Sequence, residues 1–422
     1  MTNTNIQMKK LILLTGLLLS IGLKAQVMNG TVRQQSISII NQADNVLRTL
    51  GNEQQVLALY MNAIVADPTY SVAYMKRANL LARINRPNEA LQDYNTAIAL
   101  NPNSAILYDF RAKVKVLQTD YEGAISDLNQ ALKLEPYNDI ILDERAELRT
   151  LTNNFTAALT DYDSLLLHHK NDTLTYIRRA LLFMKQKQWD DARHDLNVAL
   201  KLDSTSALAY DIMGLIEKEE ENYEAAEEFF TKAIELNPEF SVAYFNRSVV
   251  RKKTGNLNGS LADLNRAIEV QSDFTNAYFN RAIAKKLLGD MEGAKLDYDS
   301  AIYLNENFAN AFLNRGFTKK ILENYEEAAN DFKMATLMMP DNAKAHNALG
   351  NVRVLFSDYW EAINDFNNAL RLDNNYSAAY FNRGLAKILM YNSIGGCEDF
   401  SRAIELGFEK AVEYKNSFCA NF

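Results

Sequence analysis

Three kinds of side chain recur together in the second half of the sequence: a large apolar residue, an asparagine directly after it and, in three cases, a lysine six residues further on. An apolar side chain can anchor a ligand, an amide can pair with a ligand's backbone, and a lysine can meet an acidic group. We therefore predict that this set binds a segment of a partner protein. Its members are Phe245, Asn246, Lys252, Phe279, Asn280, Lys286, Leu313, Asn314, Lys320, Phe381 and Asn382.

The phenylalanines of this set have a second interpretation, in which their rings fill gaps between neighbouring helices. The two interpretations differ in exposure. Binding predicts that Phe245, Phe279 and Phe381 are partly accessible to solvent, whereas gap filling predicts that they are buried.

An arginine and an aspartate recur sixteen residues apart in eight segments of the chain. In one further segment both are replaced by apolar residues, Met213 and Phe229. We predict that each pair forms an ion pair that fixes the register of two helices, and the alternative is a track for a polyanion. The pairs are Arg77–Asp93, Arg111–Asp127, Arg145–Asp161, Arg179–Asp195, Arg247–Asp263, Arg281–Asp297, Arg315–Asp331 and Arg383–Asp399.

Other catalytic or ligand-binding chemistry finds little support. The sequence has two cysteines and four histidines, and His168-His169 has no partner at the spacing of metal ligands. It contains no glycine-rich phosphate loop and no convincing catalytic triad. We predict no cofactor, no metal site and no enzymatic activity. The net charge of −8 argues against a nucleic-acid partner, because such binding requires a basic surface.

A repeat of 34 residues positions all of these side chains. In the unit that begins at Thr275, apolar residues recur every three to four positions over residues 276–288 and 291–304, which predicts two helices joined at Gly289-Asp290. A fixed period of this length is typical of a solenoid. Ten units follow one another without insertion, and a looser unit precedes them. They begin at Ser71, Ala105, Asp139, Thr173, Ala207, Ser241, Thr275, Ala309, Ala343 and Ser377.

The repeat resembles the tetratricopeptide repeat in its period, in an alanine four residues before an aromatic residue (Ala294 and Tyr298), and in a proline that ends four units. The resemblance implies an all-α fold, a right-handed α-solenoid of about eleven stacked antiparallel helix pairs over residues 37–408. It also implies that the first helices line a concave groove that holds protein segments. The carboxylate-clamp members of the family use Asn and Lys on these helices, although their pairing at positions 5 and 9 is absent here.

These features predict a protein-binding scaffold. Two alternatives stay open: a structural array that associates with itself through its ends or edges, and a non-catalytic subunit of an envelope enzyme complex.

The N-terminus predicts export from the cytoplasm. Lys9-Lys10 precedes thirteen apolar residues, Leu11–Leu23, and small Ala25 follows, as in a secretory signal peptide. We expect a signal peptide over residues 1–25, with Met8 as a possible start, and a linker over residues 26–36. The alternative is that this segment stays uncleaved and anchors the protein. After cleavage we expect no membrane span. The periplasm or cell envelope is the expected location.

The C-terminus predicts a cap. Residues 409–422 have a helical pattern outside the last unit, and a solenoid must cover its final apolar face. Cys397 and Cys419 would lie near each other if this helix folds back on the array, which permits a disulfide in an oxidising compartment. The alternative is two small buried thiols.

Overall fold

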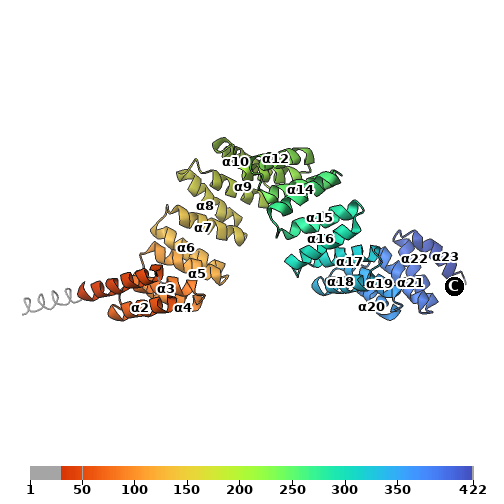
Figure 1. Ribbon diagram of the computed structural model, residues 1–422, viewed down its shortest axis with the longest axis horizontal. Helices are drawn as coiled ribbons and strands as arrows, with labels where there is room; N and C mark the ends of the chain where they lie inside the picture. Colours follow the sequence, from red (N-terminus) through yellow and green to blue (C-terminus); the bar gives the residue numbers. More distant parts are fainter. Residues whose placement is uncertain (1–29, 50, 421–422) are drawn as a thin grey trace, which may run out of the picture. The chain divides into compact units, whose positions relative to one another are not determined.

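The computed structural model describes residues 30–49 and 51–420, so the predicted signal peptide, residues 1–25, lies outside the described part. The described secondary structure is entirely helical. No helix in it combines the length and the apolar character that crossing a bilayer requires. The chain divides into two compact units, Met1–Leu202 (unit 1) and Asp203–Phe422 (unit 2), which are shown in Figure 1.

Unit 1 begins, within the described residues, with a helix over residues 30–49. This helix includes residues 30–36, where the sequence predicted a linker. The helices that follow are α2 (Glu53–Ala66), α3 (Ser71–Arg83), α4 (Pro87–Leu100), α5 (Ala105–Leu117), α6 (Tyr121–Leu134), α7 (Asp139–Leu151), α8 (Phe155–His168), α9 (Thr173–Lys185) and α10 (Trp189–Leu202).

Unit 2 continues the same alternation up to a shorter final helix. Its helices are α11 (Ala207–Glu219), α12 (Tyr223–Leu236), α13 (Ser241–Lys253), α14 (Leu257–Val270), α15 (Thr275–Leu287), α16 (Met291–Leu304), α17 (Ala309–Ile321), α18 (Tyr325–Met338), α19 (Ala343–Leu355), α20 (Tyr359–Leu372), α21 (Ser377–Leu389), α22 (Ser393–Glu405) and α23 (Lys410–Phe418).

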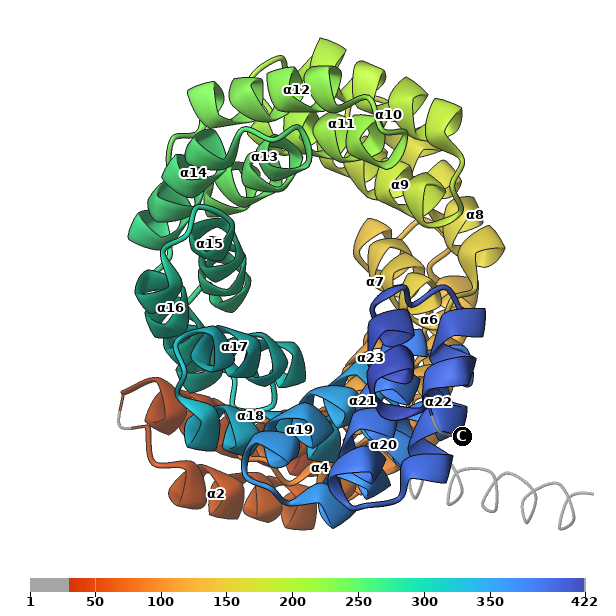
Figure 2. The same cartoon turned by 90° about the vertical axis from the view of Figure 1, so that its right-hand side faces the viewer.

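Each repeat is an antiparallel helix pair, as the period predicted. In the repeat that begins at Thr275, Gly289 has a φ of 89° and turns the chain, and the Asp290 side chain accepts a hydrogen bond from the Gly293 amide to start α16. Successive pairs stack so that first helices lie beside first helices. Figure 2 shows the result within unit 2, where α13, α15 and α17 form one layer and α14, α16 and α18 the other.

The two helices of a repeat approach closely because a small residue faces a large one. Phe230 of α12 is fully buried against Gly214 of α11, and a methyl group added at Gly214 would lie 2.6 Å from a ring carbon. Phe332 and Gly316 repeat this arrangement at 2.7 Å. Such close packing fixes the spacing of the pair, so these positions belong to the scaffold.

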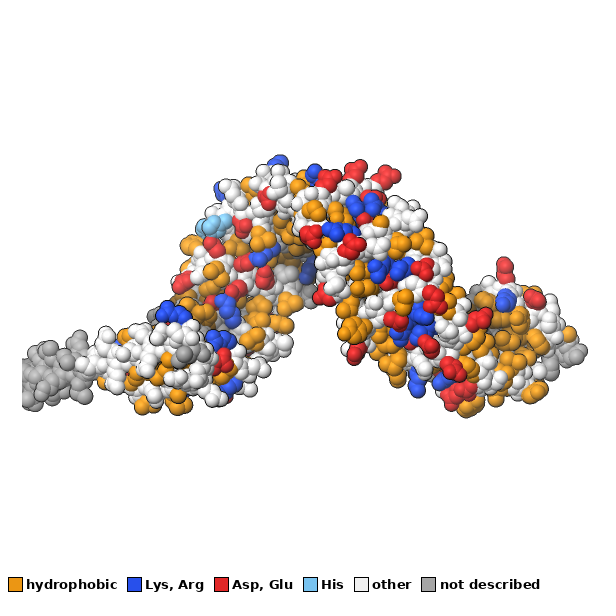
Figure 3. Space-filling view, viewed as in Figure 1, with side chains coloured by type: hydrophobic (Ala, Val, Ile, Leu, Met, Phe, Trp, Pro, Cys, Tyr) orange, Lys and Arg blue, Asp and Glu red, His pale blue; other side chains and the backbone are white. Residues whose placement is uncertain are grey.

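The last helix closes the array. Helix α23 covers the end of unit 2, and a disulfide joins Cys419 directly after it to Cys397 of α22, with a Cα–Cα distance of 5.8 Å. The sequence had left this pairing open against two free thiols, and the structure has the disulfide. The charged side chains of both signs are mixed over the face of the two units that Figure 3 shows.

Candidate functional site

The predicted arginine–aspartate pairs are present in all eight repeats. In the repeat that begins at Thr275, Arg281 Nε donates to Asp297 Oδ2 at 2.9 Å and Nη2 donates to Oδ1 at 2.7 Å. Only 3% of the Asp297 surface is exposed. A bidentate pair of this kind holds the two helices of a repeat in one register.

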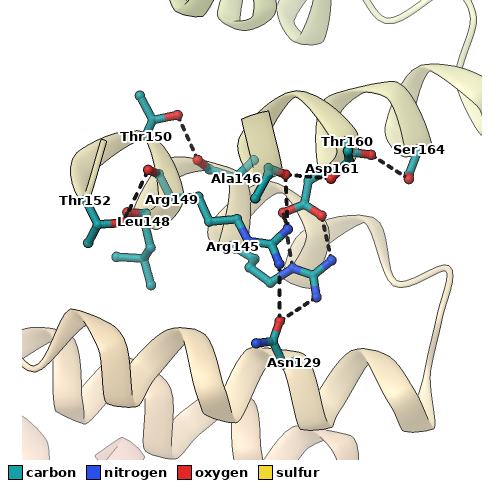
Figure 4. Close-up of polar contacts among 11 residues, drawn as sticks. Asn129, Arg145, Ala146, Leu148, Arg149, Thr150, Thr152, Thr160, Asp161 and Ser164 are labelled. Atoms are coloured by element: carbon teal, nitrogen blue, oxygen red, sulfur yellow. Dashed lines mark hydrogen bonds and ion pairs between the residues drawn. The ribbon is translucent and has the colours of Figure 1, made fainter. Parts of the chain in front are cut away.

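The third nitrogen of the guanidinium reaches the preceding repeat, which the sequence reasoning missed. Arg145 Nη1 on α7 donates to Asn129 Oδ1 on α6 at 2.7 Å, while Nε and Nη2 bind Asp161 on α8 (Figure 4). In seven of the eight arginines every guanidinium nitrogen is thus engaged within the protein, which leaves Arg77, among the described residues, with bonds from Nε and Nη2 alone. Equivalent bonds join Arg111 to Asn95, Arg179 to Asp163, Arg247 to Thr231, Arg281 to Asn265, Arg315 to Asp299 and Arg383 to Asn367.

Most of the buried aspartates bind a second cation, four residues after the arginine. Lys285 Nζ lies 2.8 Å from Asp297 Oδ2. In the repeat that begins at Ala343, Leu349 replaces the arginine and Arg353 alone holds the aspartate, 2.7 Å from Asp365 Oδ2. Burial raises the pKa of Asp365 to about 6 even so, although Arg353 opposes that shift. These cations are therefore part of the scaffold.

The candidate binding surface is the layer of first helices in unit 2, which we call the first-helix face of unit 2. It comprises the side chains at positions 2, 5, 6 and 12 of the repeats that begin at Ser241, Thr275, Ala309 and Ala343. Phe245 and Phe279 lie on it and are half-buried, as the binding interpretation predicted. They also pack on rings that precede the next first helix, with centroids 5.1 Å apart for Phe245 and Phe274 and 4.8 Å for Phe279 and Phe308. The gap-filling interpretation is thus correct in part.

Two apolar members of the predicted set are buried. Phe381 is only 5% exposed, so the prediction that its ring is accessible was wrong. The cause is the cap, because Phe381 packs against Phe408 and Tyr414 with a centroid distance of 4.9 Å in each case. Leu313 is likewise 5% exposed and belongs to the core with Phe332. Neither side chain can anchor a ligand without a rearrangement.

The asparagines of the set use their amide donors within the protein. Asn246 is buried and donates to both carboxylate oxygens of Asp211, whose pKa burial raises to about 6. Asn382 donates to Asn347 Oδ1 at 2.9 Å. Asn280 and Asn314 each donate to the carbonyl of the residue four positions earlier. Each amide group therefore already bonds within the protein, and pairing of a ligand's backbone with the second N–H of Asn280, Asn314 or Asn382 stays a prediction.

The lysines of the set differ from one another. Lys252 Nζ donates to Asn280 Oδ1 at 2.8 Å. Lys286 and Lys320 are half-buried, yet neither makes an ion pair with any residue in the described ranges. Asn280 is at position 6 of the repeat that follows Lys252. The same position in the repeat that follows Lys320 holds Ala348, whose side chain has no acceptor. These two ammonium groups are partly desolvated without a counter-ion.

The electrostatics of the two lysines follow from that burial. Burial lowers the pKa of Lys320, and it lowers the pKa of Lys286 together with repulsion from Lys344 of α19. Lys344, which the sequence reasoning missed, lies with Nζ 5.1 Å from the centre of the Phe317 ring. The sequence could have indicated Lys344 only through its positive charge at position 2 of the repeat that begins at Ala343. Lys286, Lys320 and Lys344 come from three successive first helices, α15, α17 and α19, and we call these three lysines the lysine row.

The first-helix face of unit 1 carries charges that compensate one another. Lys113 Nζ lies 2.9 Å from both Asp109 Oδ2 and Glu144 Oε1, and Arg178 binds Asp143. Burial, with Asp109 close by, raises the pKa of Glu144 to about 7, although Lys113 opposes the shift. Position 12, which holds a lysine in four successive repeats of unit 2, holds Ala82, Val116, Thr150 and Met184 in unit 1.

Models of the tetratricopeptide repeat match three segments of the chain, residues 71–104, 207–240 and 275–308. Each segment coincides with one observed helix pair, and the same pair recurs in both units. The chain is a tetratricopeptide repeat protein. The resemblance drawn from the sequence is thereby confirmed, together with the all-α solenoid of stacked antiparallel helix pairs.

Solved tetratricopeptide repeat structures are similar to parts of this chain. A tetratricopeptide repeat protein from Parabacteroides merdae is 19% identical, with a TM-score of 0.43 over 57% of this chain and 95% of that chain. YrrB, described as a TPR protein with an unusual peptide-binding site, is 27% identical, with a TM-score of 0.38 over 44% of this chain and 95% of that chain. Yeast Tom70 is 13% identical, with a TM-score of 0.39 over 92% of this chain and 96% of that chain. Among curated proteins, no sequence matches significantly.

Proposed function

We propose that this tetratricopeptide repeat protein is a binding scaffold and that its first-helix face in unit 2 holds an acidic segment of a partner protein. The observation that carries the proposal is the pair Lys286 and Lys320, which are half-buried without an ion-pair partner among the described residues. Burial deprives the two ammonium groups of part of their hydration. A carboxylate placed between them compensates for this loss through its opposite charge.

The shape of the ligand follows from the spacing of these groups. Lys286, Lys320 and Lys344 come from three successive first helices, so a ligand that meets all three must run across the helices. An extended segment with several Asp or Glu residues satisfies this condition. Phe245 and Phe279, which are half-buried on the same first-helix face, offer ring surface to an apolar side chain of the same segment.

We also propose that the protein acts outside the cytoplasm, in the periplasm or cell envelope. Two independent features support this location. The sequence has an apolar run of signal-peptide length after Lys9-Lys10, and the cap is held by the disulfide Cys397–Cys419, which persists in an oxidising compartment. Reporter fusions tested for export, with and without residues 1–25, would decide the point.

The test of the binding proposal is a titration with a fluorescein-labelled, glutamate-rich peptide, followed by anisotropy at low and moderate salt. We expect binding that weakens with salt, and a loss of at least about tenfold in affinity for Lys286→Glu combined with Lys320→Glu. The matched control is Lys333→Glu, an exposed lysine on α18 in the second-helix layer.

Two results would overturn the proposal. One is equal binding of a lysine-rich peptide of the same length, which would show that charge does not select the ligand. The other is an equal loss for Lys333→Glu, which would show that net charge rather than the first-helix face decides binding. Melting curves of all variants exclude unfolding as the cause of a loss.

A further inference from the structure

The turns between the two helices of the last two repeats expose a group of large apolar side chains. Seven such residues are between 41% and 96% exposed, and we call them the apolar edge. Hydrophobic side chains gather over this end of unit 2 in Figure 3. The members are Leu355, Phe356 and Trp360 around the α19–α20 turn, and Leu389, Met390, Tyr391 and Ile394 around the α21–α22 turn.

The repeat fold does not require apolar residues at the positions of Trp360 and Tyr391. Where Trp360 stands, the two preceding repeats have Glu292 and Glu326. Where Tyr391 stands, with a φ of 63°, Glu221 and Glu323 adopt the same left-handed conformation with φ of 63° and 61°. Trp360, Tyr391 and Ile394 are therefore particular to the last two repeats, whereas the positions of Leu355 and Leu389 hold the exposed Leu287 and Ile321 in the two preceding repeats.

The apolar edge is large enough to form an interface. The three aromatic side chains alone expose about 400 Å², and the four aliphatic ones bring the patch toward the roughly 800 Å² that each partner contributes to an interface of standard size. A patch of this extent exceeds what a monomeric soluble protein ordinarily leaves uncovered.

We propose that the apolar edge is the contact between two copies of this chain. Residues 355–360 contain one charged residue, Asp358, and residues 389–394 contain none, so the occupant must itself be apolar and nearly free of charge. The edge of a second copy has this character, and a two-fold contact places each edge on the other. Two alternatives fit less well. Stacking through the C-terminal end of the array is blocked by α23, which the disulfide holds in place. A lipid surface would be matched by basic side chains among the apolar ones, and both turns lack them.

This contact is independent of the proposed ligand site, since it uses the turns rather than the lysine row. The test is sedimentation velocity of the purified chain over a range of concentrations. We expect a dimer at micromolar concentration and at least a tenfold weaker association for Trp360→Glu combined with Tyr391→Glu. Each substitution introduces the residue that other repeats of this chain have at the same position, so the fold tolerates it. The paired variant would bring two carboxylates from each copy into the contact, where neither turn supplies a cation.

The matched control is Tyr303→Glu, because Tyr303 lies on α16 of the same unit and is 86% exposed. We expect this variant to dimerise like the unaltered chain. The proposal is overturned if the unaltered chain is monomeric throughout, if Tyr303→Glu dissociates the dimer to the same extent, or if the dimer survives the paired substitution. Co-sedimentation of a monomeric chain with phosphatidylglycerol vesicles, lost in the paired variant, would instead assign the apolar edge to a membrane.

Discussion

The first-helix faces of the two units differ in whether their charged side chains are paired. In unit 1 the cations are balanced, with Lys113 between Asp109 and Glu144 and Arg178 on Asp143. In unit 2, Lys286 and Lys320 are half-buried with no ion-pair partner in the described residues. A balanced face is complete by itself, whereas an unbalanced face is ready for an anion. The difference teaches that first-helix layers with the same backbone can differ in charge compensation, and we propose that the uncompensated layer binds the ligand.

The scaffold beneath the two faces is the same. Arg179–Asp195 in unit 1 and Arg281–Asp297 in unit 2 have the same bidentate geometry, and both arginines also bind the preceding repeat. Functional positions can therefore change from repeat to repeat without disturbing the helix pairs. Each prediction below tests one side of this comparison, beginning with the scaffold.

The largest effect is expected where a buried aspartate has only one cation. Asp195 is 1% exposed, and Phe183 stands where other repeats have the second cation. Arg179→Ala should lower the free energy of unfolding by about 3–5 kcal/mol, because it leaves a buried charge unpaired. Arg281→Ala should cost less, about 2 kcal/mol, since Lys285 remains 2.8 Å from Asp297. Urea denaturation measures both.

A control for this prediction already exists in the chain. Arg281→Met combined with Asp297→Phe copies Met213 and Phe229 of the repeat that begins at Ala207. This double substitution should lower the free energy of unfolding less than Asp297→Ala alone does. Asp297→Ala leaves both Arg281 and Lys285 without their carboxylate. If Arg281→Ala proves as costly as Arg179→Ala, the second cation contributes nothing and this part of the account fails.

The next effect concerns the two ends of the array. Unit 2 ends in a disulfide between residues 22 apart, whereas no disulfide holds the helix over residues 30–49 in unit 1. Cys397→Ser combined with Cys419→Ser should destabilise the cap by about 3 kcal/mol. Amide hydrogen exchange should then accelerate in α23 and leave residues 30–49 unchanged. Unchanged exchange in α23 would show that Phe408 and Tyr414 hold the cap without the disulfide.

The smallest effect is the pH dependence of stability that Glu144 adds in unit 1, above the pH range of Asp211 and Asp365 in unit 2, whose pKa values burial raises to about 6. The folded protein raises the pKa of Glu144 from its ordinary value of 4.5 to about 7, chiefly through burial. Between these values the folded state holds a proton that the unfolded state has released, so stability should fall as pH rises from about 4.5 to about 7. Solvent screens a group that is partly exposed, so we expect a change of no more than about 1 kcal/mol. Urea titrations of Glu144→Gln should show a smaller fall in stability above pH 6 than the unaltered chain does, and an equal fall there would assign the dependence to another group.

Sequence reasoning predicted the scaffold well and the binding surface less well, for a physical reason. The repeat period and the joint replacement at Met213 and Phe229 reveal contacts within one helix pair, because both partners recur at fixed spacing. The bond from Arg145 to Asn129 escaped notice because the acceptor varies between Asn, Asp and Thr along the chain. Phe381 has the same local sequence as Phe279, and only the cap that folds over it decides its burial. Exposure of a repeated residue depends on neighbours that the repeat itself does not encode.

The most direct test of the central claim is a carbodiimide cross-link between a glutamate-rich peptide and the intact chain, mapped by mass spectrometry. The reagent joins a lysine amine to a carboxylate in contact with it, so it reports where the peptide lies. We predict cross-links at Lys286, Lys320 and Lys344, and none at the exposed Lys333 of α18. Cross-links spread over exposed lysines of both units, with Lys286 and Lys320 unlabelled, would contradict the assignment of the lysine row as the binding site.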